Sequence, residues 1–190
     1  MRELRLDSAR SRIRIHTFAE GLFARLAHDL ELACGGLTGT ATQTGEDGAR
    51  TGMARLEAPL GDIAVTGVLG KDDRVDERAL SPSDRREIIA KMQEDVFHAG
   101  PEAAVRVEAV LDGARVRVRI QPPNGKGVEV VVEPELTSDG TDLRARGAFE
   151  ISLASIGARV IKAPMGAFRV KDHVRVTFDV VFATARAQTC

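Results

Sequence analysis

Alternation of apolar and polar residues at every second position is the feature that most constrains this chain of 190 residues. In AVRVEAVL, residues 104–111, one face carries Val105, Val107, Ala109 and Leu111, and the other carries Arg106 and Glu108. The same pattern recurs in RVRVRIQ (115–121), VEVVVEP (128–134), LRARGAFEISL (143–153) and VRVTFDVVF (174–182). Successive side chains of a strand point to opposite faces, so each segment has one dry and one wet face. This pattern is typical of antiparallel sheets.

The first part of the chain is less regular, but it indicates strands as well. RIRIH (12–16), LELACGGLTGTATQ (30–43), GMARLEA (52–58) and DIAVTGV (62–68) are shorter apolar segments. Gly35 and Gly36 interrupt the second of them and predict a bend of the kind that closes a sheet on itself. Asp112-Gly113 predicts a hairpin turn, because both residues tolerate a positive φ.

One helix is expected at about residues 83–97. Ser81 is the expected N-cap, Pro82 takes the first helical position and Asp84 falls in the first turn. Gly100-Pro101 ends the helical pattern. A shorter helical piece is expected at 19–27, where Leu22 and Phe23 lie in an apolar segment with helical spacing.

These strands can hide their apolar faces in two stacked sheets or in a barrel, and periodicity alone leaves both open. The length suits one domain, expected over residues 1–185, with a flexible tail at 186–190. The formal net charge of −1 gives no general attraction to nucleic acid. No segment has the pattern of a signal peptide or the length to span a bilayer, so we expect a cytoplasmic location.

The stretch AHDL raises the question of catalysis, since His28 and Asp29 adjoin there. Neighbours in a strand point to opposite faces, so the pair is poorly placed to converge on one substrate atom. We interpret His28 as capping the start of a strand and Asp29 as accepting hydrogen bonds from backbone amides. No nucleophile elbow and no short-range metal-ligand pair accompanies them, so no catalytic residue and no metal site are assigned. The sequence predicts a non-enzymatic protein.

The order of features resembles the YceI-like family of lipocalin-shaped barrels. The stretches that carry the likeness are SRIRIHTFAEGLFARLAHDLEL (11–32), the helical excursion at 67–101, and GAFEISLASIGARVIKAPMGAFRVKDHVRVTFDVVF (147–182). They span nearly the whole chain, and the most specific parts are HDL at 28–30 and KAPMGAFRVKDHVRV at 162–176. The resemblance implies an all-β fold, an antiparallel eight-stranded lipocalin-like barrel with one inserted helix.

The resemblance also implies binding or transport of an isoprenoid-type lipid, polyprenyl or quinone-like, in an apolar tunnel, without any other cofactor. His16 and His28 are the candidates for polar contact with this apolar small molecule. A barrel filled by its own side chains, acting as an interaction or stress-response module, is the alternative, and a homodimer is left open. The residues expected to line the tunnel are Ile15, Leu22, Phe23, Leu32, Val107, Val118, Ile120, Val130, Phe149, Ile151, Val176 and Phe178.

Overall fold

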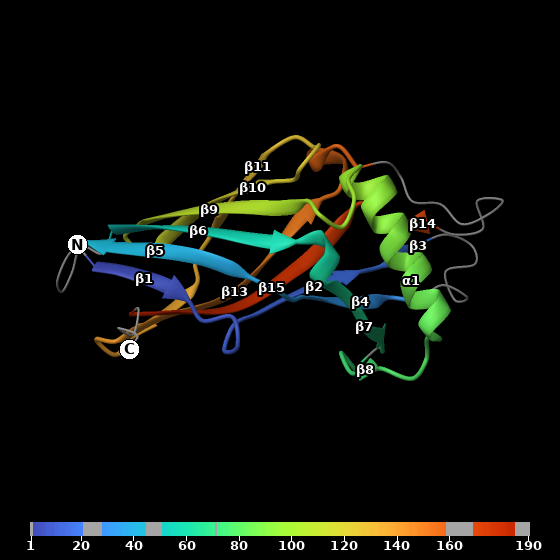
Figure 1. Cartoon of the computed structure of the whole chain (residues 1–190), viewed down its shortest axis with the longest axis horizontal. Coiled ribbons are helices and arrows are strands. Elements are labelled where there is room, and N and C mark those ends of the chain that lie inside the picture. Colours follow the sequence, from blue (N-terminus) through green and yellow to red (C-terminus); the bar gives the residue numbers. More distant parts are fainter. Residues whose placement is uncertain (1, 21–27, 45–50, 71, 159–168, 185–190) are drawn as a thin grey trace.

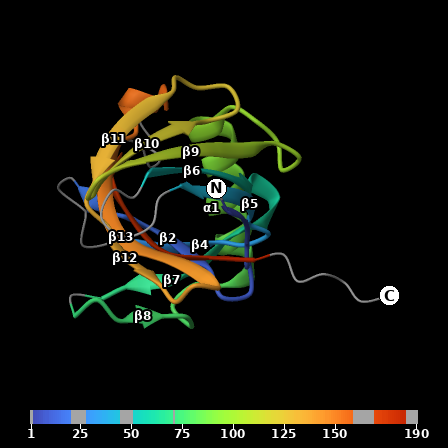
Figure 2. The ribbon, with the colours of Figure 1, turned by 90° about the vertical axis from the view of Figure 1, so that its left-hand side faces the viewer.

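The computed structural model describes residues 2–20, 28–44, 51–70, 72–158 and 169–184, and almost all of its regular structure is strand (Figure 1). Among these residues, one antiparallel sheet of thirteen strands curls around a common interior, and a separate pair, β3 and β14, lies beside it. Figure 2 views the curled sheet from its end. The strands are β1 (Arg2–Leu6), β2 (Arg12–Thr17), β3 (Ala19–Glu20), β4 (Leu30–Cys34), β5 (Thr38–Thr44), β6 (Thr51–Pro59), β7 (Ile63–Leu69), β8 (Val75–Asp76), β9 (Ala104–Asp112), β10 (Arg115–Gln121), β11 (Val128–Val132), β12 (Glu135–Ser138), β13 (Asp142–Ser152), β14 (Arg169–Val170) and β15 (His173–Ala183).

The register of the sheet follows from the alternation in the sequence. In the β9–β10 hairpin, Asp112 pairs with Arg115 and Ala109 pairs with Val118, so apolar residues meet apolar residues across the strands. Gly113 begins the turn with φ of +63°, a conformation that glycine adopts without steric penalty. A shift of one residue would turn the apolar side chains toward water, which fixes this pairing.

The curled sheet returns on itself along the chain. Hydrogen-bonded neighbours run in the order β11, β10, β9, β6, β5, β1, β15, and β15 pairs on its other edge with β13, which pairs with β12. β11 and β12 stand at the two ends of this order, and only Glu133 and Pro134 separate them in the sequence. The arrangement is consistent with a barrel.

The expectation of eight strands is wrong in number, because several long segments bend and split into two strands. Gly35 and Gly36 separate β4 from β5, and a 3-10 turn, Leu60–Asp62, separates β6 from β7. The two bends touch: the Gly35 amide donates to the Asp62 carbonyl at 2.9 Å. Gly36 has φ of +58°, and a Cβ at this position would overlap the Asp62 carboxylate. The β4–β5 segment and the β6–β7 segment therefore bend at the same place in the sheet.

The helix begins where the sequence indicates. α1 (Pro82–Lys91) has Ser81 as its N-cap, with a reciprocal capping box between Ser81 and Asp84. A π-helical segment, Met92–Phe97, continues it, so the helical chain reaches the end expected from sequence. His98 follows in the left-handed conformation, and its Nδ1 lies 2.7 Å from the Glu94 carbonyl. Figure 1 shows α1 lying across one end of the curled sheet.

The expected helical piece at 19–27 is wrong at its start. Ala19 and Glu20 form β3. Ala19 pairs with Val170 of β14, and Glu20 pairs with Arg169. The Ala19 amide donates to the Asp29 carboxylate at 2.8 Å, a long-range contact that a sequence pattern cannot show. The rest of this segment lies outside the described residues, as does the tail at 186–190.

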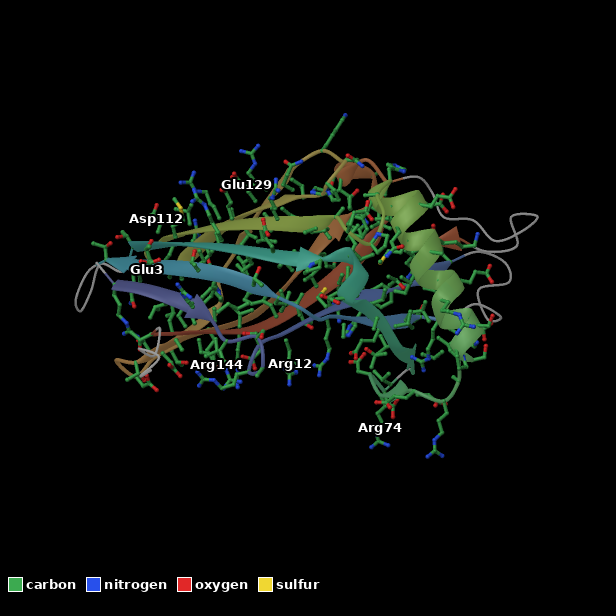
Figure 3. All side chains as sticks on the ribbon, viewed as in Figure 1. Glu3, Arg12, Arg74, Asp112, Glu129 and Arg144 are labelled. Atoms are coloured by element: carbon green, nitrogen blue, oxygen red, sulfur yellow. The ribbon has the colours of Figure 1, made fainter. Side chains whose placement is uncertain are left out.

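Apolar side chains of the described residues form two clusters inside the sheet. The larger lies toward α1 and includes Leu32, Leu60 and Phe97. The smaller includes Leu4, which has no exposed surface, and Phe182. Figure 3 shows the labelled charged side chains, among them Arg12 and Arg144, on the outside of the curled sheet. One face of the sheet is thus dry and the other is wet.

Candidate ligand-binding cavity

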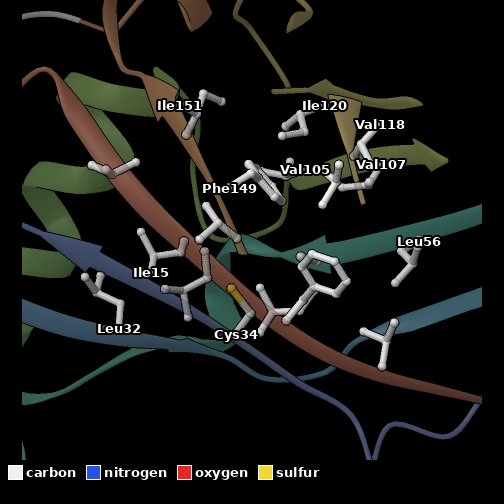
Figure 4. Close-up of a pocket in the computed structure, with 18 of the residues that line it drawn as sticks. Ile15, Leu32, Cys34, Leu56, Val105, Val107, Val118, Ile120, Phe149 and Ile151 are labelled. Atoms are coloured by element: carbon white, nitrogen blue, oxygen red, sulfur yellow. The ribbon is translucent and has the colours of Figure 1, made fainter. Parts of the chain in front are cut away.

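A cavity of about 580 Å³ lies within the curled sheet. Its walls are inward-facing side chains of the long strands, together with residues of α1 and the π-helical segment. Figure 4 shows ten labelled side chains, from Ile15 and Leu32 on one side to Val118 and Ile120 on the other, converging on this space. The volume falls within the range of about 300–1,000 Å³ that is usual for small-molecule pockets.

The alternation in the sequence produces this lining directly. On β9 the inner positions are Val105 and every second residue to Leu111, and all of them line the cavity. On β15 the same holds from Val174 to Phe182. Of the residues between them, Arg106, Glu108 and Arg175 are exposed, whereas Val181 near the end of β15 is buried. The apolar wall is therefore a consequence of strand geometry.

Most of the residues expected to line a tunnel are brought together here. Val130 is not among the lining residues, although Val132 on the same strand is. Leu22 and Phe23 lie outside the described residues. The expected residues that line the cavity are Ile15, Leu32, Val107, Val118, Ile120, Phe149, Ile151, Val176 and Phe178.

His16 lies away from the cavity. It alternates with Ile15 on β2, and its Nε2 is 3.0 Å from Oε2 of Glu31 on the neighbouring strand. Glu31 is only 8% exposed, and Arg14 lies 3.5 Å from its other carboxylate oxygen. His16 therefore belongs to a polar cluster on the outer face, which we define as His16, Glu31 and Arg14.

His28 lies at the cavity and does not cap a strand. Its side chain is exposed, lines the cavity, and makes no hydrogen bond to another described residue. Asp29, in contrast, fulfils the interpretation from sequence: its carboxylate accepts from the Ala19 amide, and its carbonyl accepts from the Leu69 amide at 2.7 Å. The joint into β4 therefore depends on Asp29, and His28 has no hydrogen-bond partner among the described residues.

Many lining residues lie outside the expected set, and three examples show why they were missed. Leu56 occupies an inner position of β6, and alternation within GMARLEA could have identified it. Cys34 also lines the cavity, and alternation from Leu32 points to it. Asp84, Glu87 and Lys91 of α1 line the cavity as well, but nothing in the sequence says which face of a helix meets a distant sheet.

Cys34 is the lining thiol within the described residues. Burial raises the pKa of its thiol to about 11, because the low-polarity surroundings disfavour the thiolate. The nucleophilic form is therefore scarce at neutral pH.

Phe149 and Phe178 form the aromatic contact of the cavity wall. Their ring centroids are 6.2 Å apart with a tilt of 47°. Gly147, on the strand that carries Phe149, leaves room for the second ring, since a Cβ there would lie 2.7 Å from Phe178 Cζ. A side chain at residue 147 would push this ring toward the cavity.

Within the part of the chain that the structure describes, no helix has the length and apolar character needed to cross a bilayer. No three metal-ligating side chains of these residues gather at one point. Besides the Cys34 thiol, the ionisable residues of the described lining are Asp84, Glu87 and Lys91 of α1 together with His28.

Comparison with known proteins supplies a likeness of fold. No protein-family profile matches the sequence, and no curated protein matches it. The crystal structure of BcnA from Burkholderia cenocepacia matches with a TM-score of 0.60, covering 93% of this chain and 98% of that chain. The two sequences are 14% identical, so the likeness concerns the fold, and the YceI-like family stays a prediction.

Proposed function

We propose that this protein is a non-enzymatic carrier that binds an amphiphilic lipid of the isoprenoid type, polyprenyl or quinone-like, in the cavity of the curled sheet. The observation that carries the proposal is the cavity itself, about 580 Å³ in volume and lined mainly by aliphatic side chains. Fold similarity to BcnA adds a precedent for the architecture over nearly the whole chain.

The chemistry of the wall supports a flexible, branched hydrocarbon. Valine, leucine and isoleucine predominate in the lining, and the protein has no tryptophan or tyrosine. Flat rings are usually held by stacking on aromatic residues, which are sparse in this chain. Each methylene that leaves water contributes about 0.8 kcal/mol, so a chain of several isoprene units could bind tightly without polar contacts.

The lining gives little support to covalent chemistry. Cys34 is held as a neutral thiol by its raised pKa. His28 has no described acidic partner that would orient it as a general base. Both observations favour binding over catalysis, because an activated nucleophile needs an adjacent base or a lowered pKa.

The cavity counts against the alternative of a barrel filled by its own side chains. A filled barrel would bring the inner side chains of opposite walls into contact, at the packing density usual for protein interiors. The inward residues of β9 and β15 instead border a common space. No contact in the structure favours the interaction or stress-response module over the carrier.

Organic extraction of gently purified protein, followed by mass spectrometry, tests the proposal. We expect a prenyl lipid or quinone in stoichiometric amount. Titration of the extracted protein with a neutral apolar fluorophore, N-phenylnaphthylamine, should then show saturable binding that added prenyl lipid displaces. Recovery of no lipid, together with no binding of the fluorophore, would overturn the carrier function.

A further inference from the structure

The cavity is chemically asymmetric from end to end. Its wall includes α1 at one end, while the end of β5 and the start of β6 contribute Gln43 and Met53 at the other. Figure 1 shows that α1 and the β5–β6 end lie at opposite ends of the molecule. At the β5–β6 end the described lining is uncharged. Apart from the neutral thiol of Cys34, the ionisable residues of the described lining are His28, just before β4, and Asp84, Glu87 and Lys91 of α1.

The helical part of this set forms one stripe. Asp84, Glu87 and Lys91 are spaced by three and four residues, so they lie on one side of α1, and Ile88 of the same stripe also lines the cavity. An amphiphile in this cavity therefore meets the charged groups of the described lining at the α1 end.

Three of these four groups are unpartnered within the described residues. The Asp84 carboxylate is already used, since it accepts from the Ser81 amide at 3.0 Å and from the Ser81 hydroxyl at 2.7 Å. Those hydrogen bonds lower the pKa of Asp84, so it remains negatively charged at neutral pH. Glu87, Lys91 and His28 are exposed, line the cavity, and make no hydrogen bond or ion pair with another described residue.

We infer that Glu87, Lys91 and His28 form a head-group site that selects a prenyl chain ending in a hydroxyl over the same chain ending in a diphosphate. A hydroxyl both donates and accepts: it can donate to the Glu87 carboxylate while its oxygen accepts from Lys91 or His28. This inference rests on the proposed function, because it names the head group of the lipid held in the same cavity.

The charges at this end argue against a diphosphate. Glu87 and Asp84 are both negative there, and Lys91 is the single lysine or arginine among the described lining residues. Of the two arginines of α1, Arg85 is engaged, because its guanidinium donates to the carbonyls of Val65, Thr66 and Glu77, and Arg86 does not line the cavity. From the described lining residues, a diphosphate would thus face more negative than positive charge, an arrangement that disfavours binding.

Displacement of N-phenylnaphthylamine by geranylgeraniol, its methyl ether and its diphosphate tests this site. We expect geranylgeraniol to bind about tenfold more tightly than the diphosphate, and the ether, which cannot donate, to bind a few-fold more weakly than the alcohol. Glu87→Gln should reduce the discrimination against the diphosphate, and Glu87→Lys should reverse it. Glu94→Gln is the matched control, because Glu94 is exposed on the following helical segment and does not line the cavity.

The outcomes separate the head-group site from the carrier function. Equal affinities for all three probes, or tighter binding of the diphosphate by the unmodified protein, would overturn the head-group site and leave the carrier intact. An unchanged preference in both Glu87 variants would overturn it as well. Failure of every prenyl probe to displace the fluorophore would overturn the carrier itself.

Discussion

The inner and outer faces of the same strands carry different kinds of interaction. On the inner face, Val118 and its neighbours on β10 are aliphatic and border the cavity. On the outer face, Arg115 donates to Glu133 at 3.0 Å across two strands. A comparable outer contact joins Arg144 and Asp179, where two nitrogens of the guanidinium reach the two carboxylate oxygens at 2.6 and 2.5 Å.

This difference indicates which face determines the specificity of ligand binding. Outer pairs lie at the surface, exposed or, for Arg144 and Asp179, half-buried, so water screens them and each contributes about 1 kcal/mol or less. Inner residues set the shape and polarity of one shared cavity. A substitution at any of them therefore changes the affinity of a ligand bound there. We therefore expect ligand binding to depend on the inner face and to be nearly independent of the outer face.

The largest effect should come from a charge placed on the inner face. Val118→Arg or Phe178→Asp should weaken prenyl lipid binding by about tenfold or more, because a charge would have to remain unsolvated beside the hydrocarbon. Isothermal titration with geranylgeraniol, with circular dichroism to verify folding, measures the effect. Arg117→Ala, one residue away on the outer face, is the control and should bind normally. Equal losses in inner and outer variants would contradict the assignment of faces.

Extra volume on the inner face should give the next largest effect. Gly147→Val should destabilise the protein by about 1–3 kcal/mol, because its side chain must displace the Phe178 ring. It should also lower lipid affinity by narrowing the cavity. Ala148→Val adds volume to an adjacent exposed residue and should change stability by at most about 0.5 kcal/mol. Urea denaturation of the two variants compares them, and similar losses would show that residue 147 has no special role.

Glu31 is an outer-face residue that differs from the exposed charged pairs, because it is nearly buried. Glu31 is 8% exposed and is approached by both His16 and Arg14. Glu31→Ala should therefore cost about 1–3 kcal/mol in free energy of unfolding, since it leaves His16 half-buried without its acceptor. Glu108→Ala, which removes the exposed partner of Arg55, should cost about 0.5 kcal/mol or less. If chemical denaturation shows that Glu31→Ala and Glu108→Ala lower the free energy of unfolding equally, Glu31 is no different from the exposed pairs.

The smallest effect concerns the inward thiol. Cys34 should react slowly with iodoacetamide at neutral pH and faster as the pH rises toward its pKa of about 11, because the thiolate is the nucleophile. Bound geranylgeraniol should slow the reaction further by covering the cavity wall. Mass spectrometry of a Cys190→Ser variant isolates Cys34, and rapid labelling at neutral pH that the lipid does not slow would show that the thiol is outside the cavity.

The sequence determined the two faces. Strict alternation in β9, β10 and β15 was enough to predict which residues point inward, because side chains of a strand alternate by geometry alone. The helix start was predictable for a similar local reason, since Ser81, Pro82 and Asp84 satisfy the first amides of α1 from within one turn. The bend at Gly35 and Gly36 was predicted, but the strand number was not, because the second bend, at Leu60–Asp62, meets the first through a contact between segments that are distant in the chain.

Only the tertiary structure decided the α1 end of the cavity. No periodicity indicates that Glu87 and Lys91 meet the same space as His28, since a helix stripe and a sheet are brought together by packing, which local sequence does not encode. The structure likewise turned His16 outward and placed His28 at the cavity without a hydrogen-bond partner among the described residues, although both lie in similar apolar surroundings along the chain. Local geometry thus gave the hydrocarbon wall of the cavity, and long-range packing gave its polar end.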